Sequence, residues 1–187
     1  GLAFPTIMAH CGLVGFSSWK LLSWRGGTYR DETGEVQVGI PFDIGVWEGV
    51  DGSAVIAALN PGHYMGKWEP RAEDLARVHE RTGLWLNLHY FGVGDRGGAQ
   101  SEENVRELME RVADPGVASG VASDVAGGVR VVVAPSHQMY LDLTPEQIAR
   151  LPRYRGELIC TQAAGGYYTA EARMKTWNRR CEQRADS

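Results

Sequence analysis

The chain has 187 residues, of which 43% are hydrophobic and 22% are charged, and its formal net charge is −4. Such a chain can bury a sizeable core, as soluble globular domains do, and the lack of a basic block argues against nucleic acid as its main partner. No apolar run approaches the roughly 20 residues of a membrane-spanning helix, so no membrane partner is expected.

Three cysteines, Cys11, Cys160 and Cys181, lie far apart and form no Cys-x-x-Cys pair. This pattern predicts free, buried thiols in a reducing compartment, and therefore a cytoplasmic protein. The chain begins at Gly1, with neither an initiator methionine nor a signal peptide. We therefore expect a fragment, or a gene model that lacks its start.

In chain order, the first predicted elements are a short helix over Pro5 to Cys11, ended by Gly12, and a strand over Val14 to Ser17. Two apolar runs follow, Ile44 to Glu48 and Ala54 to Leu59. The Gly-Val-Asp-Gly turn signal between them predicts a hairpin-like reversal.

Trp47 and Asp51 are candidate carbohydrate-binding residues of this hairpin. The ring of a tryptophan can stack on the apolar face of a sugar, and a carboxylate can accept hydrogen bonds from its hydroxyls. The alternative is a core tryptophan beside an ordinary Asp-Gly turn, and the residues alone favour it.

A weakly amphipathic helix is predicted from about Pro70 to Arg81, and a buried strand over Leu84 to Phe91. A glycine-rich loop at 92–98 follows directly, and a helix begins near Glu102 with Ser101 as its cap. A strand, a glycine loop and a helix in this order can aim N–H groups at a ligand. The loop lacks the lysine and the serine or threonine of a phosphate loop.

Val129 to Ala134 is another apolar run, typical of strands in parallel sheets. Thr144 to Gln147 is a capping box that begins a short helix through Leu151. This alternation of apolar strands and amphipathic helices predicts an α/β fold with a mainly parallel sheet.

The last stretch is expected to form a strand over Glu157 to Cys160, a loop of small residues at 162–166 and a helix that opens at Thr169. Glu157 is either a site carboxylate or a solvated glutamate at a strand end, and the residues alone favour the second. The five histidines are scattered, without the clustering of zinc ligands, and no Gly-x-Ser-x-Gly motif occurs.

Five motifs occur in a fixed order along the chain. They are Trp-x-Gly-x-Asp-Gly-Ser at 47–53, Gly-x-Gly-Asp-x-Gly-Gly at 92–98, Gly-Glu-Leu at 156–158, Gly-Gly-Tyr-Tyr-Thr at 165–169, and Lys175, Asn178, Arg179 and Glu182. This ordered set resembles the α-mannosidases of glycoside hydrolase family 38, and the resemblance covers almost the whole chain.

The resemblance implies that residues 1–168 are part of an α/β barrel-like catalytic domain of the glycoside hydrolase/deacetylase type. Residues 169–187 would then begin a helical bundle. The family consists of retaining enzymes with a zinc-centred site, so the expected partner is an α-mannoside. Their nucleophile, an aspartate of Asp-x-Phe-Gly that also binds zinc, would precede Gly1, and the other zinc ligands would lie upstream or beyond Ser187. We therefore expect zinc in the intact parent enzyme, but none in the isolated chain, which should be inactive.

By the same resemblance, Glu157 is the candidate acid/base and Asp95 its rival, while Trp47, Asp51, Asp95 and Tyr168 would contact the sugar. Departures from the family pattern at 98–100, 162–164 and 170 bear on substrate preference. The alternative function is a non-catalytic carbohydrate-binding α/β domain. Because a truncated sheet exposes strand edges, a homo-oligomer is also expected.

Overall fold

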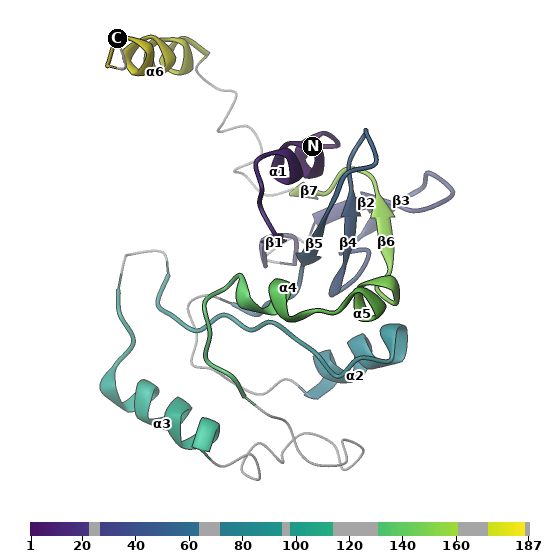
Figure 1. Cartoon of the computed structure of the whole chain (residues 1–187), viewed down its shortest axis with the longest axis vertical. Coiled ribbons are helices and arrows are strands. Elements are labelled where there is room, and N and C mark those ends of the chain that lie inside the picture. Colours follow the sequence, from purple (N-terminus) through teal and green to yellow (C-terminus); the bar gives the residue numbers. More distant parts are fainter. Residues whose placement is uncertain (23–26, 64–71, 95–97, 114–130, 161–171, 186–187) are drawn as a thin grey trace.

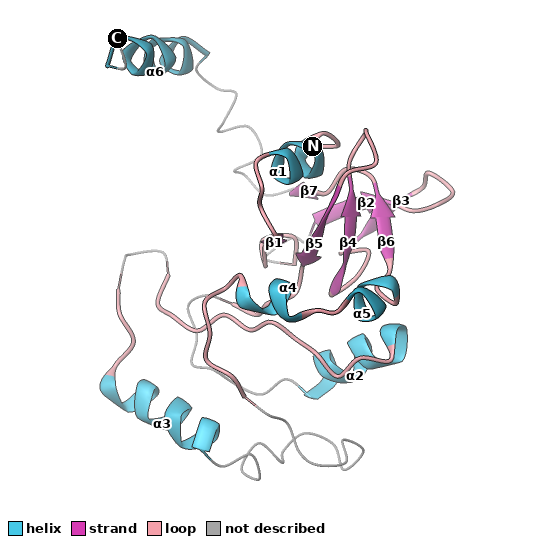
Figure 2. Cartoon of the chain, in the orientation of Figure 1, coloured by secondary structure: helices cyan, strands magenta, loops and turns pink. Residues whose placement is uncertain are grey.

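The computed structural model describes residues 1–22, 27–63, 72–94, 98–113, 131–160 and 172–185. Figures 1 and 2 show the helices and strands along this part of the chain. In chain order they are α1 (Phe4–His10), β1 (Gly15–Ser17), β2 (Gly27–Arg30), β3 (Val36–Val38), β4 (Ile44–Glu48), β5 (Ala54–Ala58), α2 (Ala72–Thr82), α3 (Glu102–Ala113), α4 (Gln138–Asp142), α5 (Pro145–Ala149), β6 (Arg153–Arg155), β7 (Ile159–Cys160) and α6 (Ala172–Ala185).

The strands form two small sheets. The first has the order β1-β5-β4-β6, and its central pair, β4 and β5, is the antiparallel hairpin that the turn signal predicted. Its two outer pairs, β1 with β5 and β4 with β6, are parallel. The second sheet has the order β3-β2-β7 and is antiparallel throughout. The described strands therefore form both parallel and antiparallel pairs. For these strands the prediction of a mainly parallel sheet is wrong.

Two apolar runs that predicted parallel strands have a different structure. Residues 84–91 form no strand; instead, Leu84, Leu86 and Leu88 pack on one face of the first sheet. Residues 131–134 also form no strand, and the side chains of Val132 and Val133 are exposed. A short apolar run shows that a segment can be buried, but it does not reveal whether a neighbouring strand will complete its hydrogen bonds.

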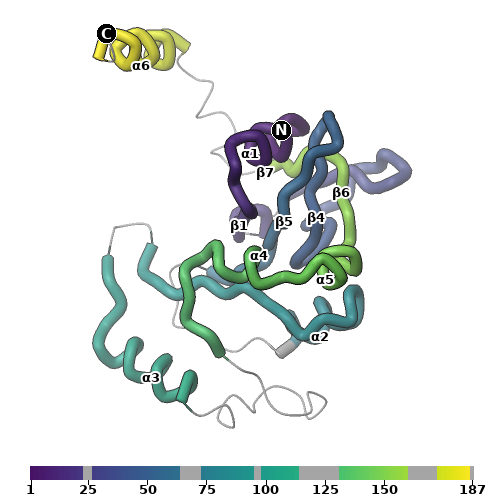
Figure 3. Tube along the Cα trace, viewed as in Figure 1, coloured from purple at the N-terminus to yellow at the C-terminus, as the bar shows by residue number. Residues whose placement is uncertain are grey.

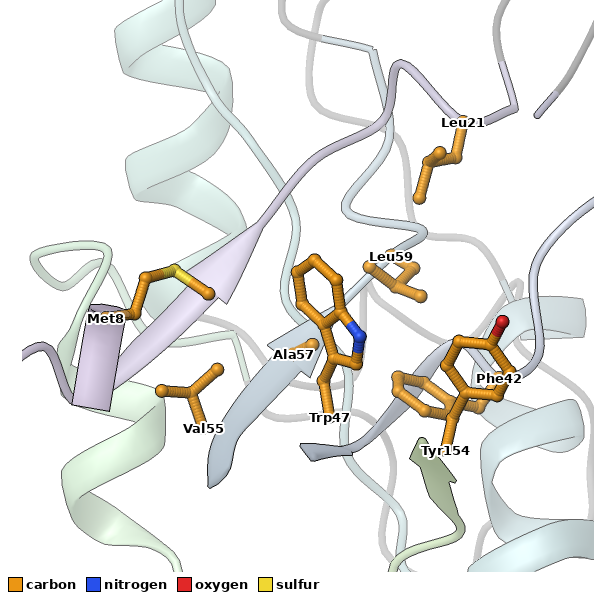
Figure 4. Packing of buried hydrophobic residues seen from close by; sticks show 8 residues of the cluster. All are labelled: Met8, Leu21, Phe42, Trp47, Val55, Ala57, Leu59 and Tyr154. Carbon is orange, nitrogen blue, oxygen red and sulfur yellow. The ribbon is translucent and has the colours of Figure 1, made fainter. Parts of the chain in front are cut away.

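The β4–β5 hairpin separates two hydrophobic clusters because its side chains alternate between the faces of the sheet. Figure 4 shows the first cluster, which α1 and the second sheet help to cover. Its buried members are Met8, Leu21, Phe42, Trp47, Val55, Ala57, Leu59 and Tyr154. The second cluster, on the other face, is covered by α4, α5 and residues 84–88. The predicted strands at 44–48 and 54–59 are thus the core of the described structure.

Two helix caps that the sequence predicted are present in the structure. The Thr144 hydroxyl accepts a hydrogen bond from the Gln147 N–H, and the Gln147 side chain accepts one from the Thr144 N–H, which completes the predicted capping box. The Ser101 hydroxyl accepts from the Asn104 N–H at the start of α3, as predicted. The predicted helix start at Thr169 lies outside the described residues, and of the predicted strand at 157–160 only Ile159 and Cys160 are paired.

α6 stands apart from both sheets in Figure 3 and has no buried residue. Met174 and Trp177, on its predicted apolar face, are exposed. Cys11 and Cys181 are free thiols, as predicted, but they are exposed and not buried: Cys11 directly follows α1, and Cys181 lies on α6, which has no buried residue. Among the described helices, none has the length and apolar character needed to cross a membrane.

Candidate functional site

Glu157 lies where β6 turns toward β7, and its backbone is held by two side chains. The Trp47 indole Nε1–H donates to the Gly156 carbonyl oxygen at 2.9 Å, and the Tyr154 hydroxyl donates to the Glu157 carbonyl oxygen at 3.1 Å. The same hydroxyl accepts from the Arg30 N–H of β2 at 3.2 Å. The backbone at Glu157 is therefore held by Trp47, which lies in the core of the first sheet, and by Tyr154, which is itself hydrogen-bonded to the second sheet.

Tyr154 is buried and fills the space beside Gly156. A Cβ atom added to Gly156 would lie only 2.4 Å from the Tyr154 hydroxyl oxygen, so a larger residue at 156 would displace the phenol or the turn. The Tyr154 ring also packs edge-on against Tyr29, with ring centroids 5.7 Å apart. Burial raises the pKa of Tyr154, which keeps the phenol neutral and able to donate its hydrogen.

The Glu157 side chain itself points out of this packing. It is 54% exposed, and its Oε1 lies 3.8 Å from the Gly1 nitrogen. Gly1 and Glu157 are thus neighbours, although they lie near opposite ends of the chain. A fixed backbone with an exposed carboxyl suits a group that must reach a ligand or a reacting atom.

Trp47, the candidate sugar platform, is a core residue in this structure. Only 2% of it is exposed, and its ring packs against Phe16 at a centroid distance of 5.4 Å. Figure 4 shows the indole between Ala57, Leu59 and the rings of the same cluster. The alternative that the sequence raised, a core tryptophan, is the one observed, because strand alternation turns Trp47 to the face that α1 covers.

Asp51, the second hairpin candidate, is occupied by its own protein. Its Oδ1 accepts from the Thr6 hydroxyl at 2.7 Å and from the Ser53 hydroxyl and N–H, and its Oδ2 lies 2.8 Å from His10 Nε2. Bonds from Ser53, His10 and Thr6 hold the Asp51 pKa well below its usual range. The carboxylate holds the hairpin turn against α1, and each of its two oxygens already contacts polar groups of the protein.

This contact also explains the glycine at the hairpin turn. A Cβ added to Gly49 would meet the Thr6 hydroxyl oxygen at 2.1 Å and the Thr6 nitrogen at 2.7 Å. The backbone of the turn therefore approaches α1 too closely for any side chain at position 49. The Trp-x-Gly-x-Asp-Gly-Ser motif is, in this structure, a docking element between hairpin and helix.

Asp95 and Tyr168 lie outside the described residues. The segment that leads to the glycine loop packs, through Leu84, Leu86 and Leu88, on the face opposite the Trp47 cluster. Gln100 joins the two ends of the loop by donating to the Gly92 carbonyl at 2.9 Å. Glu157 and the approach to the glycine loop are therefore on different faces of the first sheet.

Sequence reasoning missed Tyr154 and also a buried polar network at the other end of the hairpin. There Asp43 accepts from Asn60 Nδ2 at 2.7 Å and from Arg77 of α2 at 2.9 Å, and Arg77 also pairs with Asp74. These carboxylates raise the pKa of Arg77. The available signal in the sequence was a pair of polar residues that flank the apolar hairpin: Asp43 precedes β4 and Asn60 follows β5. The network fastens α2 to the sheet.

A metal site was expected only outside this chain. Among the described residues, no group of three or more His, Cys, Asp or Glu side chains could hold a metal ion. The described residues therefore do not fit a zinc site.

No known protein-family model matches the chain. It is, however, similar over 182 residues to α-mannosidase 2C1 from Mus musculus, at 29% identity, and from Homo sapiens, at 27% identity, in each case over 96% of this chain. It is also 25% identical over 187 residues to α-mannosidase G from Dictyostelium discoideum. The chain spans only about 15% of the length of these relatives, 14% for the last. Similarity to several proteins named α-mannosidase, over nearly the whole chain, supports a relationship to α-mannosidases.

Proposed function

We propose that this chain is a segment of a retaining α-mannosidase of glycoside hydrolase family 38 type, in which Glu157 is the general acid/base. The similarity to three named α-mannosidases supports the enzyme class. The nucleophile and the zinc ligands would come from other parts of the protein. The barrel-like domain and a helical bundle that begins at α6 belong to the same proposal.

The approach of Glu157 to Gly1 is the observation that carries this assignment. The Asp-x-Phe-Gly motif of the family places the nucleophile three residues before a glycine that Gly1 would match. Three residues span at most about 10 Å, and Glu157 Oε1 lies 3.8 Å from the Gly1 nitrogen. The preceding chain could thus bring a carboxylate within the roughly 5 Å that a retaining glycosidase requires between its two carboxyls.

Glu157 would protonate the leaving oxygen while the nucleophile attacks the anomeric carbon, which breaks the glycosidic bond and forms a glycosyl-enzyme. It would then take a proton from the water that hydrolyses this intermediate. The carboxyl is exposed while its backbone is held by Trp47 and Tyr154, an arrangement that suits both steps.

The alternative, a non-catalytic sugar-binding domain, relied on Trp47, Asp51 and the glycine loop at 92–98, of which residues 95–97 lie outside the described residues. In the structure, Trp47 is buried and Asp51 is engaged by Thr6, His10 and Ser53. The described part of the hairpin thus gives this alternative no support.

The proposal can be tested with two purified proteins: the 187-residue chain, and the full-length protein that includes whatever precedes Gly1 and follows Ser187. We expect the full-length protein to hydrolyse an aryl α-mannoside, with the α-anomer as the first sugar product by NMR. The 187-residue chain should show neither hydrolysis nor tight zinc binding. Hydrolysis by a monomeric 187-residue chain, or a β-anomer from the full-length protein, would contradict the proposal.

A further inference from the structure

The residue that most directly connects Glu157 to the rest of the fold is Tyr154. Its hydroxyl donates to the Glu157 carbonyl oxygen at 3.1 Å and accepts from the Arg30 N–H at 3.2 Å. One hydroxyl therefore joins β2 of the second sheet to the turn that carries the carboxylate. Each of its two contacts reaches a backbone atom, so the phenol controls where the turn lies.

The surroundings of Tyr154 leave this hydroxyl little freedom. The residue is only 8% exposed, and its ring is wedged edge-on against Tyr29. Gly156 has no room for a side chain because the Tyr154 ring and hydroxyl occupy that space. A buried hydroxyl that both donates and accepts is held in one orientation, because breaking either bond would leave a buried polar group unpaired.

The carboxyl of Glu157 has no comparable packing of its own, since its side chain is 54% exposed. Its position must therefore be set through its backbone, at Gly156 and Glu157. Trp47 holds the first of these carbonyls and Tyr154 the second. Trp47 is also a large core residue, so replacing it would disturb much more than this turn, whereas the Tyr154 hydroxyl can be removed alone.

We propose that Tyr154 is a positioning residue for the acid/base carboxyl of Glu157: its hydroxyl sets the distance between that carboxyl and the glycosidic oxygen. This inference rests on the proposed function. Removing the hydroxyl leaves the ring, and so most of the core packing, in place, but it releases the turn from β2. Proton transfer should suffer first, because it depends on a separation fixed to a fraction of an ångström.

The test compares Tyr154→Phe, Tyr29→Phe and Glu157→Gln in the full-length protein. Tyr29→Phe is the matched control, since it removes a hydroxyl from the neighbouring ring of the same pair. Each variant is assayed for kcat/KM on an alkyl α-mannoside, whose leaving group needs protonation, and on an activated nitrophenyl α-mannoside, whose leaving group does not.

We expect Tyr154→Phe to lower kcat/KM on the alkyl mannoside by about tenfold or more, and on the activated one by about twofold or less. Tyr29→Phe should change both by about twofold or less. An equal loss on both substrates, or none, would overturn the positioning role if Glu157→Gln shows the selective loss. If Glu157→Gln itself shows no selective loss, the acid/base assignment fails, and this inference fails with it. The two failures are therefore distinguishable.

Discussion

Two carboxylates of this chain occupy contrasting turns. Asp51, between β4 and β5, accepts hydrogen bonds from Thr6 and Ser53 and pairs with His10. Glu157, between β6 and β7, is held through its own carbonyl and that of Gly156, while its side chain remains 54% exposed. The two turns differ in which part of the residue the protein holds.

This difference distinguishes a carboxylate that stabilises the fold from one that is available for chemistry. When neighbours hold the carboxylate oxygens, the group stabilises a contact and has little capacity for a substrate. When neighbours hold the backbone, the oxygens stay available while their position is still restricted. Both turns also depend on Trp47: it belongs to the hairpin that Asp51 closes, and its indole binds the Gly156 carbonyl.

The largest expected effect follows from this shared support. Trp47→Ala should lower the free energy of unfolding by about 3–5 kcal/mol, because it removes a buried aromatic ring and leaves a cavity. Chemical denaturation of the full-length protein measures it, with Val38→Ala on exposed β3 as the control, for which a change within about 0.5 kcal/mol is expected. Unchanged stability together with lost mannoside binding would instead make Trp47 a surface sugar platform.

A second comparison replaces each of the two carboxylates by the corresponding amide. Asp51→Asn should lower the unfolding midpoint clearly more than Glu157→Gln does, because only Asp51 loses charge-assisted bonds that join two elements. Conversely, Glu157→Gln should reduce catalysis far more than Asp51→Asn does. Thermal unfolding and mannoside hydrolysis of both variants measure the two rankings. If either ranking is reversed, the distinction between the turns is wrong.

The same contrast predicts a pH dependence. Since the folded pKa of Asp51 lies below that of an unfolded carboxyl, about 4, its stabilising contribution is complete above that pH. The contribution is lost as the pH falls from about 4 through the folded pKa. The difference in unfolding midpoint between wild type and Asp51→Asn should therefore be constant from about pH 6 to about pH 5 and shrink below about pH 4. A difference that grows on acidification would contradict this sign.

The smallest effect concerns one of the donors to Asp51. Thr6→Val removes the hydroxyl bond to Asp51 but keeps the branched side chain that packs beside Gly49. We expect a lower midpoint than wild type, but a smaller loss than in Asp51→Asn, since the Ser53 and His10 contacts remain. Thr176→Val on exposed α6 is the matched control. A loss as large as that of Asp51→Asn would show that the Thr6 hydroxyl bond carries nearly all of the Asp51 contribution, which would contradict the shared role of Ser53 and His10.

The hairpin and the helix caps could be predicted because their signals are local. Two apolar runs joined by a Gly-Val-Asp-Gly turn specify β4 and β5, and Thr144 with Gln147 specifies the start of α5. The runs at 84–91 and 129–134 were assigned as strands from apolarity alone. Whether such a run joins a sheet depends on strands elsewhere in the chain, and the described residues of both runs belong to neither of the two described sheets.

The candidate site could be predicted only in part, for the same reason. Glu157 was identified by its motif, but its nearness to Gly1 is a contact between the two ends of the chain. Tyr154 carried no local signal, because its role depends on Arg30, 124 residues away. The burial of Trp47 depends on which face α1 covers, so two interpretations fitted the same motif until the packing was known.

In the proposed mechanism Glu157, and not Asp95, protonates the leaving group. The most direct measurement is the ratio of kcat/KM for an activated aryl α-mannoside to that for an alkyl α-mannoside, in full-length Glu157→Gln and Asp95→Asn. We predict that this ratio rises by about a hundredfold or more in Glu157→Gln, because only the alkyl leaving group needs the lost proton. In Asp95→Asn it should stay within about threefold of wild type. A large rise in Asp95→Asn, with none in Glu157→Gln, would contradict the assignment.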